Sequence, residues 1–247
     1  MNKQTLLFDL DDTLSHCNKY FIESKNEFVA NMLNWFDNIT EEEIRIKQME
    51  IDIQSINQYG LRSSRYPESL VSTYKFFCMK YNQKMDHEKM IKLRKIGFSV
   101  FDIPVQPYPE MYNVLNTLKD DGHELCLYTG GDVKTQMKKV AHLELESYFQ
   151  DRVYIFEHKN TYSLKQILNS HNLNRSVTWM IGNSLKTDIR PALEVGIHAV
   201  HIPVKEDWSY NVTNLEKSQA DKLLTIDSLV QLPKVIRDYA TFDSKVI

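Results

Sequence analysis

Near its start the chain reads Thr5-Leu6-Leu7-Phe8-Asp9-Leu10-Asp11-Asp12-Thr13-Leu14, and this stretch decides the fold. The apolar run over residues 5–8 has no polar alternation, which is typical of a strand buried on both faces of a parallel sheet. Acidic residues follow the run directly. We therefore predict a strand over residues 4–9 whose carboxyl end carries a group of carboxylates.

Residues 16–101 have the pattern of helices. Apolar and aromatic residues between Tyr20 and Phe36 recur at steps close to 3.6 residues, which indicates one buried helical stripe. Thr40-Glu41-Glu42-Glu43 predicts a capping box at the start of the next helix. Pro67 predicts the first residue of a third helix, and Asp86 predicts the cap of a fourth. Helices without a convincing strand between them favour a small four-helix bundle.

Beyond a proline-rich connector at 104–109, strands and helices alternate. The predicted strands are 124–128, 153–156, 177–181, 199–202 and an edge strand at 223–226; the predicted helices are 110–121, 132–143, 161–171, 189–195 and 228–239, with a polar loop over 205–221. Such alternation predicts an α/β fold, a doubly wound parallel Rossmann-like sheet. Because the first strand must join this sheet, residues 1–15 and 105–247 are predicted to form the core domain, with residues 16–104 as an inserted helical domain.

Composition excludes several classes of protein. The 247 residues include 30 Lys and Arg against 33 Asp and Glu, and this balance gives no support for binding nucleic acid. The apolar runs are too short to span a membrane. Three cysteines without a CxxC pair argue against a zinc knuckle and for a reducing compartment. With no signal peptide pattern, we expect a cytoplasmic location. The composition does not indicate an oligomeric state.

Polar residues follow the predicted strands at the edge where an open α/β sheet binds its ligand. They are Asp9 and Asp11 after the first strand, Thr129 and Gly130 after the second, Lys159 after the third, and Asn183 and Asp188 after the fourth. Two carboxylates as close in sequence as Asp9 and Asp11 repel each other unless a cation lies between them or one is protonated. Hard oxygen ligands suit Mg²⁺. One carboxylate is then available to attack phosphorus while the other moves protons.

Each candidate also has a purely structural interpretation. Asp12 or Thr13 fits a helix cap, and Thr129-Gly130-Gly131 fits an ordinary strand-to-helix turn. Lys159 fits a solvated surface residue, with Lys165 as a competing phosphate ligand. Asp188 fits the N-cap of a helix that begins at residue 189. The concurrence of all these residues at one edge of the sheet favours a functional site.

Taken in order, four segments resemble the motifs of the haloacid dehalogenase-like hydrolase superfamily. They are Phe8–Leu14, Tyr128–Gly131, Lys159, and Ile181–Asp188 with Pro191-Ala192 and Gly196. The resemblance implies that Asp9 is a nucleophile forming an aspartyl-phosphate, and that Asp11 protonates the leaving group and then activates water. It implies that Thr129, Gly130 and Lys159 bind the phosphoryl group. The helical insertion would be the family's cap domain.

The resemblance also implies a Mg²⁺ site formed by Asp9, the backbone carbonyl of Asp11 and Asp188. Many members have an acid where this chain has Asn183, and the amide oxygen of Asn183 is a weaker ligand. We therefore expect weakened rather than abolished Mg²⁺ binding.

The function that these residues favour is a Mg²⁺-dependent phosphatase acting on a small phosphorylated metabolite. A phosphomutase shares the same aspartyl-phosphate and remains an alternative. A phospho-receiver or metal-binding regulatory module is disfavoured, because a receiver carries its phosphorylated Asp after the third strand, where this chain has Phe156-Glu157-His158. In the helical domain, we expect core packing for Tyr20, Phe21 and Tyr66 and solvation for Arg62 and Arg65, rather than contact with substrate.

Overall fold

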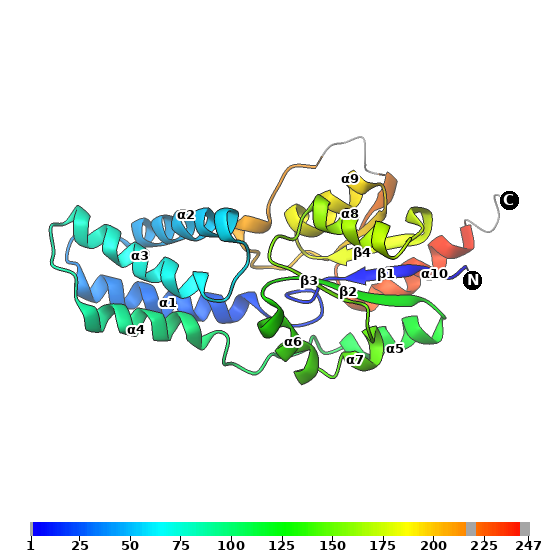
Figure 1. Cartoon of the computed structure of the whole chain (residues 1–247), viewed down its shortest axis with the longest axis horizontal. Helices are drawn as coiled ribbons and strands as arrows, with labels where there is room; N and C mark the ends of the chain where they lie inside the picture. The colour runs from blue at the N-terminus through cyan, green and yellow to red at the C-terminus, as the bar shows by residue number, and fades with distance from the viewer. Residues whose placement is uncertain (1, 216–220, 243–247) are drawn as a thin grey trace. The chain divides into compact units, whose positions relative to one another are not determined.

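The computed structural model describes residues 2–215 and 221–242, and the chain divides into two compact units (Figure 1). The α/β unit comprises Met1–Asn18 and Val105–Ile247, and the helical unit comprises Lys19–Pro104. Part of the predicted loop over 205–221, namely residues 216–220, lies outside the described residues. Across the described ranges, no helix is long and apolar enough to cross a membrane.

The α/β unit is built on a six-stranded sheet in the order β3-β2-β1-β4-β5-β6, with every pair of neighbours parallel. Its strands are β1 Thr5–Phe8, β2 Glu124–Gly130, β3 Val153–Phe156, β4 Thr178–Gly182, β5 His198–His201 and β6 Leu223–Thr225. The predicted fold class is confirmed. Strand β2 runs two residues further than predicted and includes Thr129 and Gly130.

Burial on both faces explains why Leu6, Leu7 and Phe8 of β1 follow one another without a polar residue. In β1, Leu6 and Phe8 pack into one hydrophobic core, whereas Leu7 packs into a second core on the other face. Helices α8 and α9 lie on one side of the sheet and α5, α6 and α7 on the other (Figure 1). The helices of this unit are α5 Met111–Asp120, α6 Val133–His142, α7 Glu146–Phe149, α8 Thr161–Ser170, α9 Arg190–Val195 and α10 Leu232–Phe242.

Four predicted helices of this unit, α5, α6, α9 and α10, begin one to four residues later than expected, and α7 was not predicted. The segment before α9 forms a separate π-helical turn over Leu185–Ile189, so that the α-helix begins at Arg190. A 3-10 turn at Leu229–Gln231 precedes α10. The short helix α7 has too few residues for a periodic pattern to show in the sequence.

The helical unit contains α1 Asn18–Trp35, α2 Glu41–Tyr59, α3 Arg65–Lys80 and α4 His87–Ser99. The predicted capping box is present, since Glu43 N–H donates to Thr40 Oγ1 at 3.2 Å and Thr40 N–H donates to Glu43 Oε2 at 3.0 Å. Pro67 is the third residue of α3 rather than the first.

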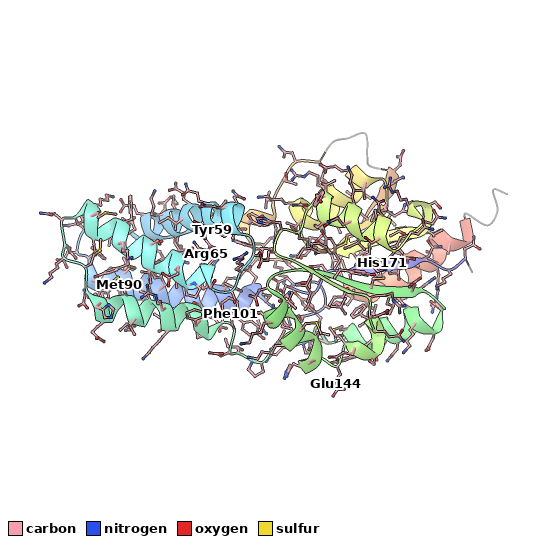
Figure 2. The ribbon with its side chains drawn as sticks, in the orientation of Figure 1. Tyr59, Arg65, Met90, Phe101, Glu144 and His171 are labelled. Carbon is pink, nitrogen blue, oxygen red and sulfur yellow. The ribbon has the colours of Figure 1, made fainter. Side chains whose placement is uncertain are left out.

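The aromatic side chains singled out in the sequence pack within this unit. Tyr20 and Tyr66 are buried in its core, and Phe21 packs against that core. The guanidinium of Arg65 stacks on the ring of Tyr59, 4.0 Å from the ring centroid (Figure 2). Arg65 therefore packs on an aromatic ring, whereas solvation alone was predicted for it.

One buried carboxylate lies inside the helical unit and takes no part in its apolar packing. Asp52 on α2 is 8% exposed. Burial raises the pKa of Asp52 to about 6, although attraction to Lys25 and hydrogen bonds from Ser69 and Gln48 act in the opposite direction. Burial also lowers the pKa of Lys25. The folded unit therefore favours the protonated form of Asp52 more than an unfolded chain does.

This shift predicts how stability depends on pH. Because the pKa of Asp52 is higher in the folded state than the ordinary value of 3.8, its contribution is fully present below about pH 4 and is lost as the pH rises through about 6. Between pH 4 and 7 the wild type should lose up to about 3 kcal/mol of unfolding free energy relative to Asp52→Asn. Urea denaturation at several pH values measures this difference. The exposed Asp37→Asn is the matched control, and equal pH dependence in all three proteins would contradict the prediction.

Candidate active site

Asp9 lies where the strand order of the sheet reverses. It follows β1, which is flanked by β2 and β4, and its backbone N–H donates to Ile181 O at 2.9 Å. Ligands of open α/β sheets bind at such a reversal, beyond the carboxyl ends of the strands. The Asp9 side chain is nevertheless almost fully buried.

A buried lysine lies between Asp9 and Asp188. The Lys159 ammonium is 2.5 Å from Asp9 Oδ1 and 2.5 Å from Asp188 Oδ1, so these two oxygens are no more than 5.0 Å apart. Burial acts to lower the pKa of Lys159, but attraction to Asp188 and Asp9 outweighs it and raises the pKa above its usual value. The interpretation of Lys159 as a solvated residue is wrong. The competing Lys165 is exposed on α8.

The positive charge of Lys159 does not fully offset the cost of ionising the buried carboxyl of Asp9. Burial raises the pKa of Asp9 to about 7, together with the nearby charges of Asp188 and Asp11 and against the opposing effect of Lys159. An additional cation beside Asp9 would therefore stabilise its ionised form.

Asp188 is held in place by the π-helical turn that follows β4. The Ser184 side chain accepts from Thr187 N–H at 3.1 Å, and Ser184 N–H donates to Asp188 Oδ2 at 2.9 Å. Asp188 is 1% exposed and lies within the turn, while Ile189 occupies the N-cap position of α9. The alternative of Asp188 as the N-cap of that helix is therefore wrong.

Asp11 forms an ion pair with Lys139, a residue that was not predicted to belong to the site. Lys139 Nζ on α6 lies 2.6 and 2.7 Å from the two oxygens of Asp11, and Gln136 Nε2 donates to Asp11 Oδ2 at 3.1 Å. Burial acts to lower the pKa of Lys139, but the attraction of Asp11 outweighs it and raises the pKa above its usual value. Asp9 and Asp11 therefore contact different lysines.

The position of α6 explains how Gln136 and Lys139 reach Asp11. Asp132 caps the helix by accepting from Thr135 N–H at 2.9 Å, so α6 begins directly after the Thr129-Gly130-Gly131 segment. Gln136 and Lys139 are three residues apart and share one face of its first two turns. That face is near the carboxyl edge of the sheet.

The remaining candidates lie around Asp9. Thr129 is buried, and its Oγ1 accepts from Gln136 Nε2 at 2.6 Å. Thr13 Oγ1 lies 3.2 Å from Asp9 Oδ2 and 3.4 Å from Asn183 Oδ1, so the hydroxyl connects the candidate nucleophile to the amide. Gly130 is the last residue of β2.

Asp12 has the structural role that the sequence analysis kept open for it. Its carboxylate accepts from Cys17 N–H at 2.9 Å and from Asn18 N–H at 2.9 Å, at the start of α1. Of the three acids after β1, Asp12 therefore satisfies backbone donors, while Asp9 and Asp11 contact the lysines.

The donor set of the site fits Mg²⁺. Within residues 2–215 and 221–242, no three His, Cys, Asp or Glu side chains converge into a cage for a metal ion. Mg²⁺ does not need such a cage, because it is usually held by one or two carboxylates together with water and phosphate oxygens. Asp9 and Asp188 provide two carboxylates whose oxygens are at most 5.0 Å apart.

Comparisons with known proteins were made at the level of sequence and of structure. A sequence model described as haloacid dehalogenase-like hydrolase matches residues 6–202. A glyceraldehyde 3-phosphate phosphatase from Methanocaldococcus jannaschii is 27% identical over 80% of this chain and 83% of its own length, and one from Pyrococcus abyssi is 25% identical over 80% of each chain. A haloacid dehalogenase-like family hydrolase from Xanthomonas campestris has a similar structure, with a TM-score of 0.78, 19% identity and coverage of 96% of this chain and 91% of its own.

The packing of Asp188 yields a prediction about Gly182. A Cβ at Gly182 would lie 2.2 Å from Asp188 Oδ2 and 2.5 Å from its Cγ, so the glycine leaves the space that the carboxylate occupies. Gly182→Ala should lower the unfolding free energy by about 1–3 kcal/mol through overpacking. Urea denaturation measures this cost in the wild-type background and in Asp188→Ala, where the two closest contacts are absent. The same cost in both backgrounds would show that the Asp188 carboxylate is not the clashing group.

Proposed function

Because the chain belongs to the haloacid dehalogenase-like hydrolase family, we propose that it is a phosphatase of a small phosphorylated metabolite. One observation carries this proposal: buried Lys159 contacts both Asp9 and Asp188, at the edge of the sheet where Asp11 also lies. A carboxylate nucleophile, a proton-transfer group and a cation for the phosphoryl oxygens are then available together. The names of the relatives favour a three-carbon sugar phosphate as the class of substrate.

The proposed reaction has two steps. In the first, an Asp9 oxygen attacks phosphorus while the bond to the leaving oxygen breaks, and Asp11 gives that oxygen a proton so that an alcohol departs. In the second, Asp11 takes a proton from water as the water attacks the aspartyl-phosphate, which releases phosphate and restores Asp9. Lys159 and Thr129, together with the backbone of Gly130, would bind the phosphoryl oxygens.

Asp9, Asp188 and the backbone carbonyl of Asp11 would hold Mg²⁺, with Asn183 as a weak additional ligand. When bound, Mg²⁺ supplies positive charge that offsets the negative charge on Asp9 and on the transferred oxygens. The raised pKa of Asp9 supports this assignment, because a buried carboxyl that resists ionisation gains most from a neighbouring cation. We assign the helical residues 16–104 the role of a cap domain that selects the leaving group.

The first test is a panel of phosphorylated sugars, three-carbon phosphates and nucleotides, assayed with and without Mg²⁺. We expect Mg²⁺-dependent phosphate release from at least one small phosphate ester. Asp9→Asn should reduce the rate by a factor of about 10⁴ or more, because the amide is a poor nucleophile. Intact-mass measurement after rapid acid quench should detect a phosphorylated wild type and an unmodified variant.

Asp37→Asn, an exposed change in the helical unit, is the control for the general effect of losing a carboxylate. No phosphate release from any ester would contradict the proposal. Transfer of phosphate to a second sugar, in place of release, would favour the phosphomutase alternative.

A second test concerns the amide at the proposed metal site. Replacing Asn183 with Asp adds a negative charge close to Thr13 and Asp9. The Mg²⁺ concentration for half-maximal activity should fall by about tenfold, which corresponds to about 1.4 kcal/mol of added attraction. Titration of activity with Mg²⁺ measures the change, and an unchanged midpoint would show that residue 183 does not influence the metal.

A further inference from the structure

Helix α6 supplies two side chains to the site that the proposed reaction leaves without a role. We propose that Gln136 and Lys139 are positioning residues, which hold the Asp11 carboxylate and the Thr129 hydroxyl in the orientations that phosphoryl transfer requires. The inference rests on the proposed function. It concerns the placement of two reacting groups and assigns neither Gln136 nor Lys139 a contact with substrate.

Gln136 connects the two groups through a single nitrogen. Its Nε2 lies 2.6 Å from Thr129 Oγ1 and 3.1 Å from Asp11 Oδ2, and the residue is 1% exposed. The amide nitrogen of Gln136 carries two N–H groups and donates one of them to Asp11. The second N–H of that nitrogen is then available to Thr129.

This arrangement determines the direction of the Thr129 hydroxyl. A threonine hydroxyl has one hydrogen to donate and two lone pairs that accept. Because Gln136 donates to Thr129 Oγ1, the contact uses a lone pair and leaves the O–H free to donate to a phosphoryl oxygen. Without Gln136, the hydroxyl would be free to rotate and to use its hydrogen on another acceptor.

Lys139 fixes the Asp11 carboxylate from the same helix. Its ammonium lies 2.6 and 2.7 Å from the two carboxylate oxygens and is largely shielded, with 19% of the side chain exposed. Contact with both oxygens restrains rotation of the carboxylate plane, which a single hydrogen bond does not. A general acid must lie within hydrogen-bond reach of the leaving oxygen, so loss of this restraint reduces the fraction of correctly placed Asp11.

The backbone before α6 is shaped to admit Gln136. Gly131 has a φ of +147°, and a Cβ there would lie 2.9 Å from Gln136 Cγ and 3.1 Å from its Cδ. Most side chains are strained at such a φ. The second glycine of the Thr129-Gly130-Gly131 segment therefore makes room for Gln136, an observation independent of the hydrogen bonds.

The test compares Lys139→Met, Lys139→Arg and Gln136→Leu with the wild type and with Lys134→Met, an exposed lysine change on the same helix. Each protein is assayed with an alkyl phosphate that the wild type hydrolyses and with p-nitrophenyl phosphate. The alkyl leaving group needs a proton from Asp11, whereas the nitrophenolate leaves almost without one. The ratio of the two kcat/KM values therefore reports the placement of Asp11.

We expect Lys139→Met and Gln136→Leu to lower kcat/KM for the alkyl phosphate by about 100-fold and for p-nitrophenyl phosphate by less than about tenfold. Lys139→Arg should recover most of the loss, and Lys134→Met should match the wild type. Gln136→Leu should also raise the inhibition constant for inorganic phosphate, through Thr129, whereas Lys139→Met should leave it within about twofold.

Equal losses for both substrates would indicate general structural damage and would overturn the inference, as would kinetics like those of the wild type. Both results leave the phosphatase proposal standing, because the wild type is active in the same assay. A wild type without activity on either substrate would overturn both proposals.

Discussion

The site depends on one buried ammonium shared by two buried carboxylates. Lys159, Asp9 and Asp188 are each at most 6% exposed, and removing charges from water in this way carries a large desolvation cost. The pair of contacts made by Lys159 offsets only part of that cost, as the raised pKa of Asp9 shows. Two carboxylates and one ammonium leave one negative charge unpaired, and an unpaired buried charge does not stabilise the fold. The proposed Mg²⁺ would offset this negative charge.

Much of the fold could be predicted because the central strands β1 and β4 are buried on both faces. The strand over 4–9, the alternation after residue 105 and the placement of β1 among later strands all follow from short apolar runs without polar alternation. Boundaries were less accurate where backbone geometry departs from the α-helix. The π-helical turn at Leu185–Ile189 has no periodic signature, yet it positions Asp188.

The sequence predicted which residues lie at the carboxyl ends of the strands, but it did not predict which side chains contact one another there. Spacing indicates which residues leave the sheet at its carboxyl edge, and the structure places Lys159 between Asp9 and Asp188. The partners of Asp11 could not be obtained in this way, because Lys139 and Gln136 lie inside a helix more than 120 residues away in sequence. A lysine within an amphipathic helix has the pattern of a solvated residue until the direction of its face is known.

Lys159 and Lys139 come from elements on opposite faces of the sheet, which explains why Asp9 and Asp11 contact different lysines. Helix α6 packs into the core that contains Leu6 and Phe8, whereas Lys159 precedes α8, which packs into the core that contains Leu7. Each carboxylate thus meets a cation from a different layer. This separation suits groups with different tasks, because a nucleophile must remain ionised beside a phosphoryl group while a proton carrier must change its charge during the reaction.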